Sequence, residues 1–190
     1  SQDIITNSYK KSFFKKNKHF SIIRAGNIIG GGDWNSSRLI PDIYNSIYMK
    51  KKLIIRNPNA IRPWQHVLDV VGAMIKLILK KRKKINSDTE IYNVGPNLKS
   101  NIKVIDLLKK IKKIHGTKKF KFSVKEIQFG ESKILKLSNQ YIKKKVGWSP
   151  KLNINQTIDL TNIWYNNFFK NKKEIFQFTK KQIKEFFKIK

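Results

Sequence analysis

The chain has 190 residues and a formal net charge of +30 at pH 7, from 42 basic and 12 acidic side chains. Hydrophobic residues make up 39% of the sequence, which excludes a disordered chain and leaves enough apolar surface for one domain with a core. There is no cysteine, which excludes disulfides and cysteine-bound metals. No apolar run reaches the length of about 18 residues that would predict a membrane-spanning helix.

A basic charge of this size suggests two kinds of partner, nucleic acid and an anionic membrane, because clustered cations bind phosphates. Only five of the 42 basic residues are Arg, however, and proteins that read bases and phosphates favour the bidentate guanidinium group. The joint abundance of Lys, Asn and Ile is typical of a chain encoded by an AT-rich genome. We therefore expect a solvated lysine surface on a cytoplasmic protein, with neither nucleic acid nor a membrane as partner.

The N-terminal half alternates helices with strands. Apolar residues at helical spacing predict a helix over 3–15, which we expect to begin upstream because Ser1 is not an initiator Met. The elements predicted next are a strand at 19–24, a glycine loop, a helix at 39–49, a strand at 52–56, a turn-rich loop ending in a short strand, and a helix at 68–80.

The C-terminal half continues this alternation. The predicted elements are a strand at 90–94, a helix at 103–115, short strands at 120–124 and 134–137, and helices at 139–146, 154–169 and 180–190. The last helix has an apolar face opposite lysines, a pattern that can either lie on an anionic membrane or pack on its own domain, and we expect the second. The alternation predicts an α/β fold, whose ligands bind at strand ends.

The glycine loop lies within the segment RAGNIIGGGDWNSSRLIP, residues 24–41. Its glycines have neither the spacing of a first Rossmann turn nor the Lys of a P-loop, so a flexible turn is one interpretation. The second interpretation is an anion site, and it depends on where the loop lies between a strand and a helix. A strand ends directly before the loop at Asn27 and a helix begins after it at Arg38, so that backbone N–H groups and an Arg converge where an anion can bind.

A second candidate is Arg62, in the segment IRPWQHV. Beside Trp64 it could clamp a pyrophosphate through two parallel hydrogen bonds, or it could be a surface Arg stacked on that ring. His66 lies in an apolar run, which favours a packed structural histidine over a catalytic base. The spacing of His, Asp and Glu predicts no metal site, and no nucleophile elbow or catalytic base is evident.

Five motifs occur together in one order: RAGNIIGGGDW, RLIPD, IIRNPNAIRPWQHV, YNVGP and KKKVGWSPKLNI. In this combination the chain resembles the CDP-glucose 4,6-dehydratase branch of the extended short-chain dehydrogenase/reductase family, from about Ser8 onward. The resemblance implies the C-terminal part, residues 1–190, of an NAD-dependent enzyme: the end of a Rossmann-type parallel sheet interleaved with a small α/β substrate-binding domain. The glycine-rich NAD turn and the catalytic Tyr, Lys and acidic group are expected upstream of Ser1.

The implied reaction converts CDP-glucose to CDP-4-keto-6-deoxyglucose with bound NAD, and the implied full-length enzyme is a homodimer. This fragment alone should be inactive. The resemblance implies that Ala25 and Gly26 lie near the nicotinamide, and that the glycines let the backbone pass close to the nucleotide sugar beneath a lid shaped by Asp33 and Trp34. The implied substrate-binding residues are Asn27, Arg38, Leu39, Arg62, Asn93 and Lys133.

Other enzymes of the same kind are alternatives, namely a sugar-nucleotide epimerase or a dehydratase acting on a GDP- or dTDP-sugar. A more distant alternative, from another class of function, is a Lys-rich domain that binds nucleic acid or a membrane surface.

Overall fold

The structure is a computed structural model that describes residues 2–14, 20–80, 89–116, 121–125 and 132–189. Its α-helices are α1 (Gln2–Phe13), α2 (Leu39–Met49), α3 (Val67–Leu79), α4 (Val104–His115), α5 (Gln140–Val146), α6 (Ile154–Lys170) and α7 (Ile175–Lys188). Its strands are β1 (Ser21–Ala25), β2 (Asn27–Ile29), β3 (Leu53–Ile55), β4 (Ile61–His66), β5 (Glu90–Val94), β6 (Asn101–Lys103) and β7 (Phe122–Val124). Two 3-10 turns occur at Leu98–Ser100 and Lys172–Glu174.

The strands form small, mostly parallel sheets, which confirms the predicted α/β class. β1 pairs with β5 and β3 pairs with β7, both in parallel. β4 lies between β2, its parallel partner, and β6, which runs antiparallel. The break between β1 and β2 falls at Gly26, where a side chain would meet the carbonyl of Pro63 at 2.5 Å.

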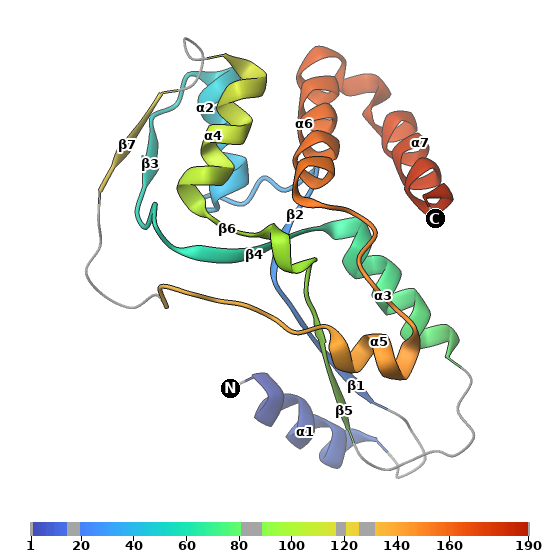
Figure 1. The fold of residues 1–190 in the computed structure, drawn as a ribbon. Coiled ribbons are helices and arrows are strands. Elements are labelled where there is room, and N and C mark those ends of the chain that lie inside the picture. Colours follow the sequence, from blue (N-terminus) through green and yellow to red (C-terminus); the bar gives the residue numbers. More distant parts are fainter. Residues whose placement is uncertain (1, 15–19, 81–88, 117–120, 126–131, 190) are drawn as a thin grey trace.

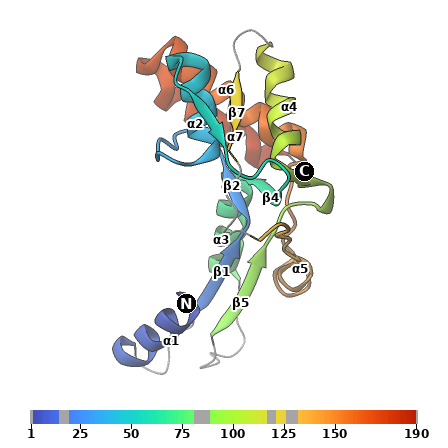
Figure 2. The same ribbon diagram turned by 90° about the vertical axis from the view of Figure 1, so that its left-hand side faces the viewer.

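The molecule has two lobes, each with its own core (Figure 1). The lower lobe contains β1 and β5 with α1, α3 and α5, and its core includes Tyr92, Val94 and Trp148. The upper lobe contains the other strands with α2, α4, α6 and α7, around a larger core. Seen from the side, the lobes form an elongated body, with the N-terminus at its lower end (Figure 2). The chain passes between the lobes several times, so the two cores are interleaved in sequence.

Local capping explains several boundaries. Helix α6 begins with a capping box, in which Asn153 and Gln156 each accept a hydrogen bond from the other's backbone N–H. Helix α3 begins directly after β4 because His66 Nδ1 accepts from the N–H of Leu68. The buried Asp69 accepts from the N–H groups of Lys151 and Leu152, which ties the segment before α6 to α3.

Helix α7 packs on α6, as the sequence predicts. Thr179 accepts a hydrogen bond from Trp164, Gln182 donates to the carbonyl of Leu160, and Phe186 is buried. The helix begins at Ile175, five residues before the predicted start. Across the described ranges, no helix combines the length and the apolar character needed to cross a membrane.

One other predicted element needs correction, and two strands were missed. The predicted strand at 134–137 is a single bridge between Ile134 and Ile61, flanked by two backbone hydrogen bonds. Strands β2 and β6 were not predicted. Each has only three residues, so neither shows a recognisable alternation, and both are strands because they pair with β4.

Candidate functional site

A cavity of about 500 Å³ lies in the upper lobe, between the N-terminal turn of α2 and the strands β2, β3 and β4. Its wall combines polar and apolar side chains in about equal measure. The polar and charged residues that line it are Asn27, Asp33, Ser37, Arg38, Asp42, Arg56, Asn57 and Arg62.

Five of the eight binding residues proposed from the sequence line this cavity: Gly26, Asn27, Arg38, Leu39 and Arg62. They come from the β1–β2 junction, the start of α2 and strand β4, so the fold brings together segments that are separate in the sequence. The other three, Ala25, Asn93 and Lys133, do not line it.

Arg62 is buried, which excludes the interpretation as a surface Arg. Its Nη1 donates to the carbonyls of Ile61 at 3.0 Å and Ser132 at 2.8 Å. The neighbouring Trp64 donates to the carbonyl of Ile102 and lines the same cavity. A guanidinium group held in this way is fixed in position beside the cavity, which suits recognition of an anion.

Asn27 stands opposite Trp64 in the β2–β4 pair, two residues from Arg62 along β4. The amide of Asn27 and the guanidinium group of Arg62 are therefore carried by adjacent strands and border one cavity. Both groups can donate hydrogen bonds to a phosphate.

The glycine loop packs closely against the rest of the protein. Gly30 and Gly31 do not line the cavity, and they make room for protein side chains. A side chain at Gly31 would come within 2.0 Å of the Trp164 ring, and one at Gly30 within 2.7 Å of Val67. These glycines therefore let the loop pack closely against α6 and α3.

Aromatic contacts hold the same loop on α6. The Trp34 ring lies 5.3 Å from Tyr165 and 4.6 Å from Phe168, between ring centroids. The Tyr165 hydroxyl donates to the carbonyl of Asp33 at 2.6 Å. The Asp33 carboxylate accepts a hydrogen bond from Arg38 at 3.3 Å, so the loop also orients a residue of the cavity.

The three remaining predicted residues do not line the cavity. Asn93 is the penultimate residue of β5, opposite Arg24, and its side-chain oxygen is buried without a hydrogen-bond partner among the described residues. Ala25 ends β1 and packs in the lower core. Lys133 is exposed, and its carbonyl accepts a hydrogen bond from Ile61. The roles assigned to these three residues stay predictions.

Sequence reasoning missed the pair Asp42 and Arg56, which lines the cavity from α2 and from the end of β3. Burial raises the pKa of the Asp42 carboxyl, while a backbone hydrogen bond from Ser37 and the charge of Arg56 oppose that rise. A signal was present, because Arg56 and Asn57 follow a strand directly, as Asn27 follows β1.

No general base is evident in the cavity. His66 is buried, as expected of a packed structural histidine, and burial lowers its pKa to about 4, so it is neutral near pH 7. Its Nδ1 also caps α3, a role that the sequence did not predict. His19 lies outside the described residues. Tyr141 and Lys145 of α5 have the four-residue spacing of a dehydrogenase Tyr–Lys pair, but neither lines the cavity. Within the part of the chain that the structure describes, no group of His, Asp and Glu could hold a metal.

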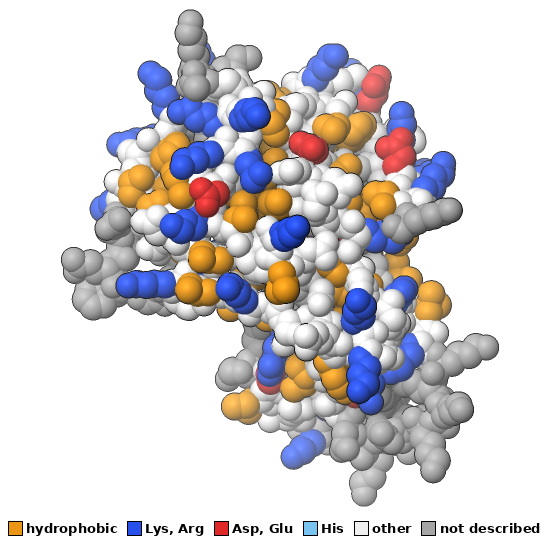
Figure 3. Space-filling view, viewed as in Figure 1, with side chains coloured by type: hydrophobic (Ala, Val, Ile, Leu, Met, Phe, Trp, Pro, Cys, Tyr) orange, Lys and Arg blue, Asp and Glu red, His pale blue; other side chains and the backbone are white. Residues whose placement is uncertain are grey.

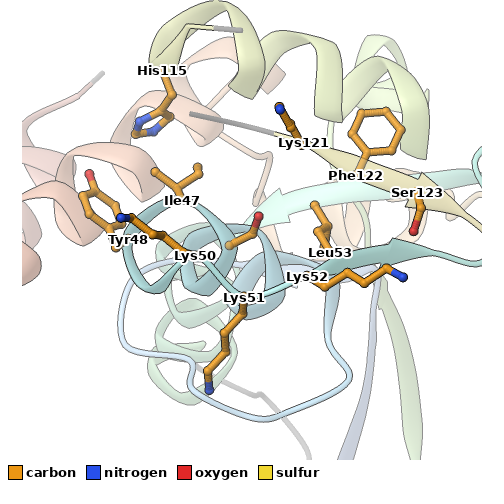
Figure 4. Close-up of a pocket in the computed structure, with 11 residues that line it drawn as sticks. Ile47, Tyr48, Lys50, Lys51, Lys52, Leu53, His115, Lys121, Phe122 and Ser123 are labelled. Atoms are coloured by element: carbon orange, nitrogen blue, oxygen red, sulfur yellow. The ribbon is translucent and has the colours of Figure 1, made fainter. Parts of the chain in front are cut away.

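A second cavity, of about 800 Å³, lies at the other end of α2, between the starts of β3 and β7 and the end of α4. Although larger, it contains none of the predicted residues. Lys51 and Lys52 extend away from His115 and Phe122, so the lysines do not converge on one point (Figure 4). On the face in Figure 3, Lys and Arg side chains are spread over both lobes and form no single basic groove.

The family model described as GDP-mannose 4,6 dehydratase matches residues 2–161 of the chain. A curated relative, CDP-glucose 4,6-dehydratase of Salmonella typhimurium, is 30% identical over 169 residues, which cover 86% of this chain and 47% of the relative. The chain therefore spans about half the length of the curated relative it matches.

Solved structures show the same fold. The dTDP-glucose 4,6-dehydratase of Bacillus anthracis in complex with NAD superposes with a TM-score of 0.68 at 22% identity, covering 90% of this chain and 50% of that one. The UDP-glucose-4-epimerase of Stenotrophomonas maltophila, with bound NAD and formylated UDP-arabinopyranose, gives a TM-score of 0.71 at 14% identity, covering 89% and 53%. Both similarities confirm an extended Rossmann-type architecture, of which this chain matches about half.

Proposed function

Because the chain belongs to the GDP-mannose 4,6 dehydratase family, we propose that it forms the sugar-nucleotide-binding part of an NAD-dependent 4,6-dehydratase acting on CDP-glucose. The observation that carries the proposal is the meeting of Gly26, Asn27, Arg38, Leu39 and Arg62 around one cavity of about 500 Å³. The choice of CDP-glucose rests on the motifs in the sequence and on the curated relative of that name.

The residues present suit a diphosphate. Arg62 is fixed by two backbone carbonyls, so its guanidinium group would lose little freedom on binding phosphate oxygens. Asn27 on the adjacent strand would donate its amide N–H to the same group, and Arg38, held by Asp33, would approach from α2. The two guanidinium groups would neutralise much of the diphosphate charge and the Asn27 amide would add a hydrogen bond, so we assign this end of the cavity to the diphosphate.

Residues at the ends of β1 and β5 fit the edge of a cofactor site. Ala25 and Gly26 carry little or no side chain, and Asn93 has a buried oxygen without a partner among the described residues. When bound there, NAD would supply reversible hydride transfer to and from the sugar. This chain's own residues would hold the diphosphate of the substrate and exclude water from the apolar walls around it.

The dehydration also needs a Tyr–Lys pair and an acidic group, and we assign these to a part of the enzyme outside residues 1–190. On this assignment the overall reaction is oxidation at C4, loss of water across C5 and C6, and return of hydride to C6. The complete enzyme would be a homodimer in the cytoplasm.

The test is a dehydratase assay that measures the absorbance of a 4-keto-6-deoxy product in alkali. The natural protein containing this chain should convert CDP-glucose, and residues 1–190 alone should not. Robust turnover by residues 1–190 alone would contradict the assignment of the catalytic groups. An epimerase or a dehydratase for another nucleotide would be recognised by competition among CDP-, UDP-, dTDP- and GDP-sugars. Tight, salt-sensitive binding to DNA or anionic vesicles, without binding of any nucleotide sugar, would favour the distant alternative.

A further inference from the structure

Two oppositely charged side chains, Asp42 and Arg56, stand at the end of the cavity formed by α2 and β3. Asp42 is partly buried in the first turn of α2, and Arg56 directly follows β3. The two elements pack against each other, since Ile43, Leu53 and Ile55 share one core. Neither charged residue has a role in the diphosphate site described above.

The cavity thus has two polar regions on different elements. Asn27 and Arg62 lie on the paired strands β2 and β4, next to the lobe that contains β1 and β5. Asp42 is in the first turn of α2 and Arg56 directly follows β3. The elements α2 and β3 lie farther from that lobe (Figure 1). The cavity wall also includes apolar side chains, among them Leu39, Ile40 and Ile55, which suit the faces of a flat ring. A nucleotide sugar whose diphosphate occupies the first region would place its base toward the second.

The carboxylate of Asp42 accepts a hydrogen bond from the backbone N–H of Ser37 and has further acceptor sites that a ligand can use. The other lining carboxylate, Asp33, already accepts hydrogen bonds from Arg38 and from the N–H of Asn35. Lys51 also attracts Asp42 electrostatically, but it lines the second cavity. Among the charged residues of the described chain, Arg56 is therefore the partner that acts on Asp42 from within the same cavity.

We propose that Asp42 and Arg56 recognise the cytosine base of the substrate, an inference that rests on the proposed function. The polar edge of cytosine presents one donor, the N4 amino group, followed by two acceptors, N3 and O2. A carboxylate accepts from the amino group, and a guanidinium group donates to the two acceptors. Uracil presents O4 and N3–H at the first two positions, which would place an acceptor against Asp42 and a donor against Arg56.

The experiment measures the affinities of CDP-glucose, UDP-glucose and GDP-mannose for the natural protein by calorimetry, with and without the substitution Asp42→Asn. The wild-type protein should bind CDP-glucose in preference to the other two. In the Asn variant, whose amide can donate to uracil O4, the ratio of CDP-glucose to UDP-glucose affinity should fall by about tenfold or more. Asp159→Asn, the same charge change on an exposed residue of α6, should leave the ratio unchanged.

Arg56→Gln provides a second variant, and because Arg56 is exposed its loss should not prevent folding. It should also reduce the ratio of CDP-glucose to UDP-glucose affinity, since the Gln amide lacks the fork that donates to N3 and O2 together and its oxygen can accept from the N3–H of uracil. An unchanged ratio in both variants would overturn the inference and leave the proposed function intact. Preference of the wild-type protein for GDP-mannose or UDP-glucose would overturn the assignment of cytosine. Failure to bind any nucleotide sugar would instead contradict the proposed function itself.

Discussion

Replacing Gly31 with alanine tests the contact between the glycine loop and helix α6. The added Cβ would lie 2.0 Å from the ring atoms Cγ and Cδ2 of Trp164 and 2.7 Å from its Cβ, whereas Cβ atoms in proteins stay at least 3.0 Å from such neighbours. The loop or the indole must therefore move by roughly 1 Å. Overpacking of this kind typically costs about 1–3 kcal/mol of the free energy of unfolding.

Trp164 can move little, because its Nε1 donates to Thr179 at 2.8 Å and its ring stacks on Phe168. We therefore expect the upper part of that range. Gly72→Ala is the matched control, since Gly72 lies inside α3 and its nearest neighbour to an added Cβ is 3.9 Å away. The control should be neutral or stabilising by about 0.5–1 kcal/mol, the usual advantage of alanine over glycine in a helix.

The assay is urea unfolding of the natural protein and both variants, followed by tryptophan fluorescence. The Gly31 variant should unfold at a clearly lower urea concentration than the Gly72 variant. If the two alanine variants were equally stable, the loop would not pack on Trp164 as described, and the assignment of its glycines to protein contacts would be wrong.

Three further predictions follow from local contacts. His66 has its pKa lowered by burial from 6.5 to about 4, so the unfolded chain binds a proton that the folded one does not. The free energy of unfolding should therefore fall by up to about 3 kcal/mol as the pH drops from 6.5 to 4, and His66→Asn, which can still cap α3, should remove this dependence in pH-titrated unfolding. Arg62→Lys should weaken calorimetric binding of CDP-glucose about tenfold or more because an ammonium lacks the planar fork, and equal affinity would contradict the diphosphate assignment. Asn153→Ala removes the capping box of α6 and should cost about 1 kcal/mol in urea unfolding, whereas an unchanged midpoint would show that the cap contributes little.

Much of the fold follows from periodicity within short windows of sequence. Helices α2, α3, α4 and α6 lie within a residue or so of their predicted bounds, because each carries an apolar face and a recognisable boundary. Strands β2 and β6 could not be predicted in this way. A strand of three residues is too short to show an alternation of apolar and polar side chains. The pairing of β2 and β6 with β4 depends on residues that are distant in the sequence.

The candidate site divides in the same manner. Asn27 and Arg62 were predicted because each is a polar residue in a strand-end motif, a signal that the chain carries locally. Asp42 and Arg56 were not: Asp42 is not unusual in its own segment, and Arg56, although it directly follows a strand, is one of many charged residues in this chain. They became a pair of interest only once the structure showed that both line one cavity.

The sequence by itself determined the α/β class, the order of most elements, and the strand-end residues that could bind an anion, because these depend on neighbours within a few positions. The tertiary structure alone decided which side chains meet. Tyr165 of α6 donates to the carbonyl of Asp33, 132 residues earlier in the chain. Position 31 has room only for a glycine because Trp164, also in α6, lies against it. Such contacts are fixed by the packing of whole elements against each other, and the spacing of residues along the chain contains no record of that packing.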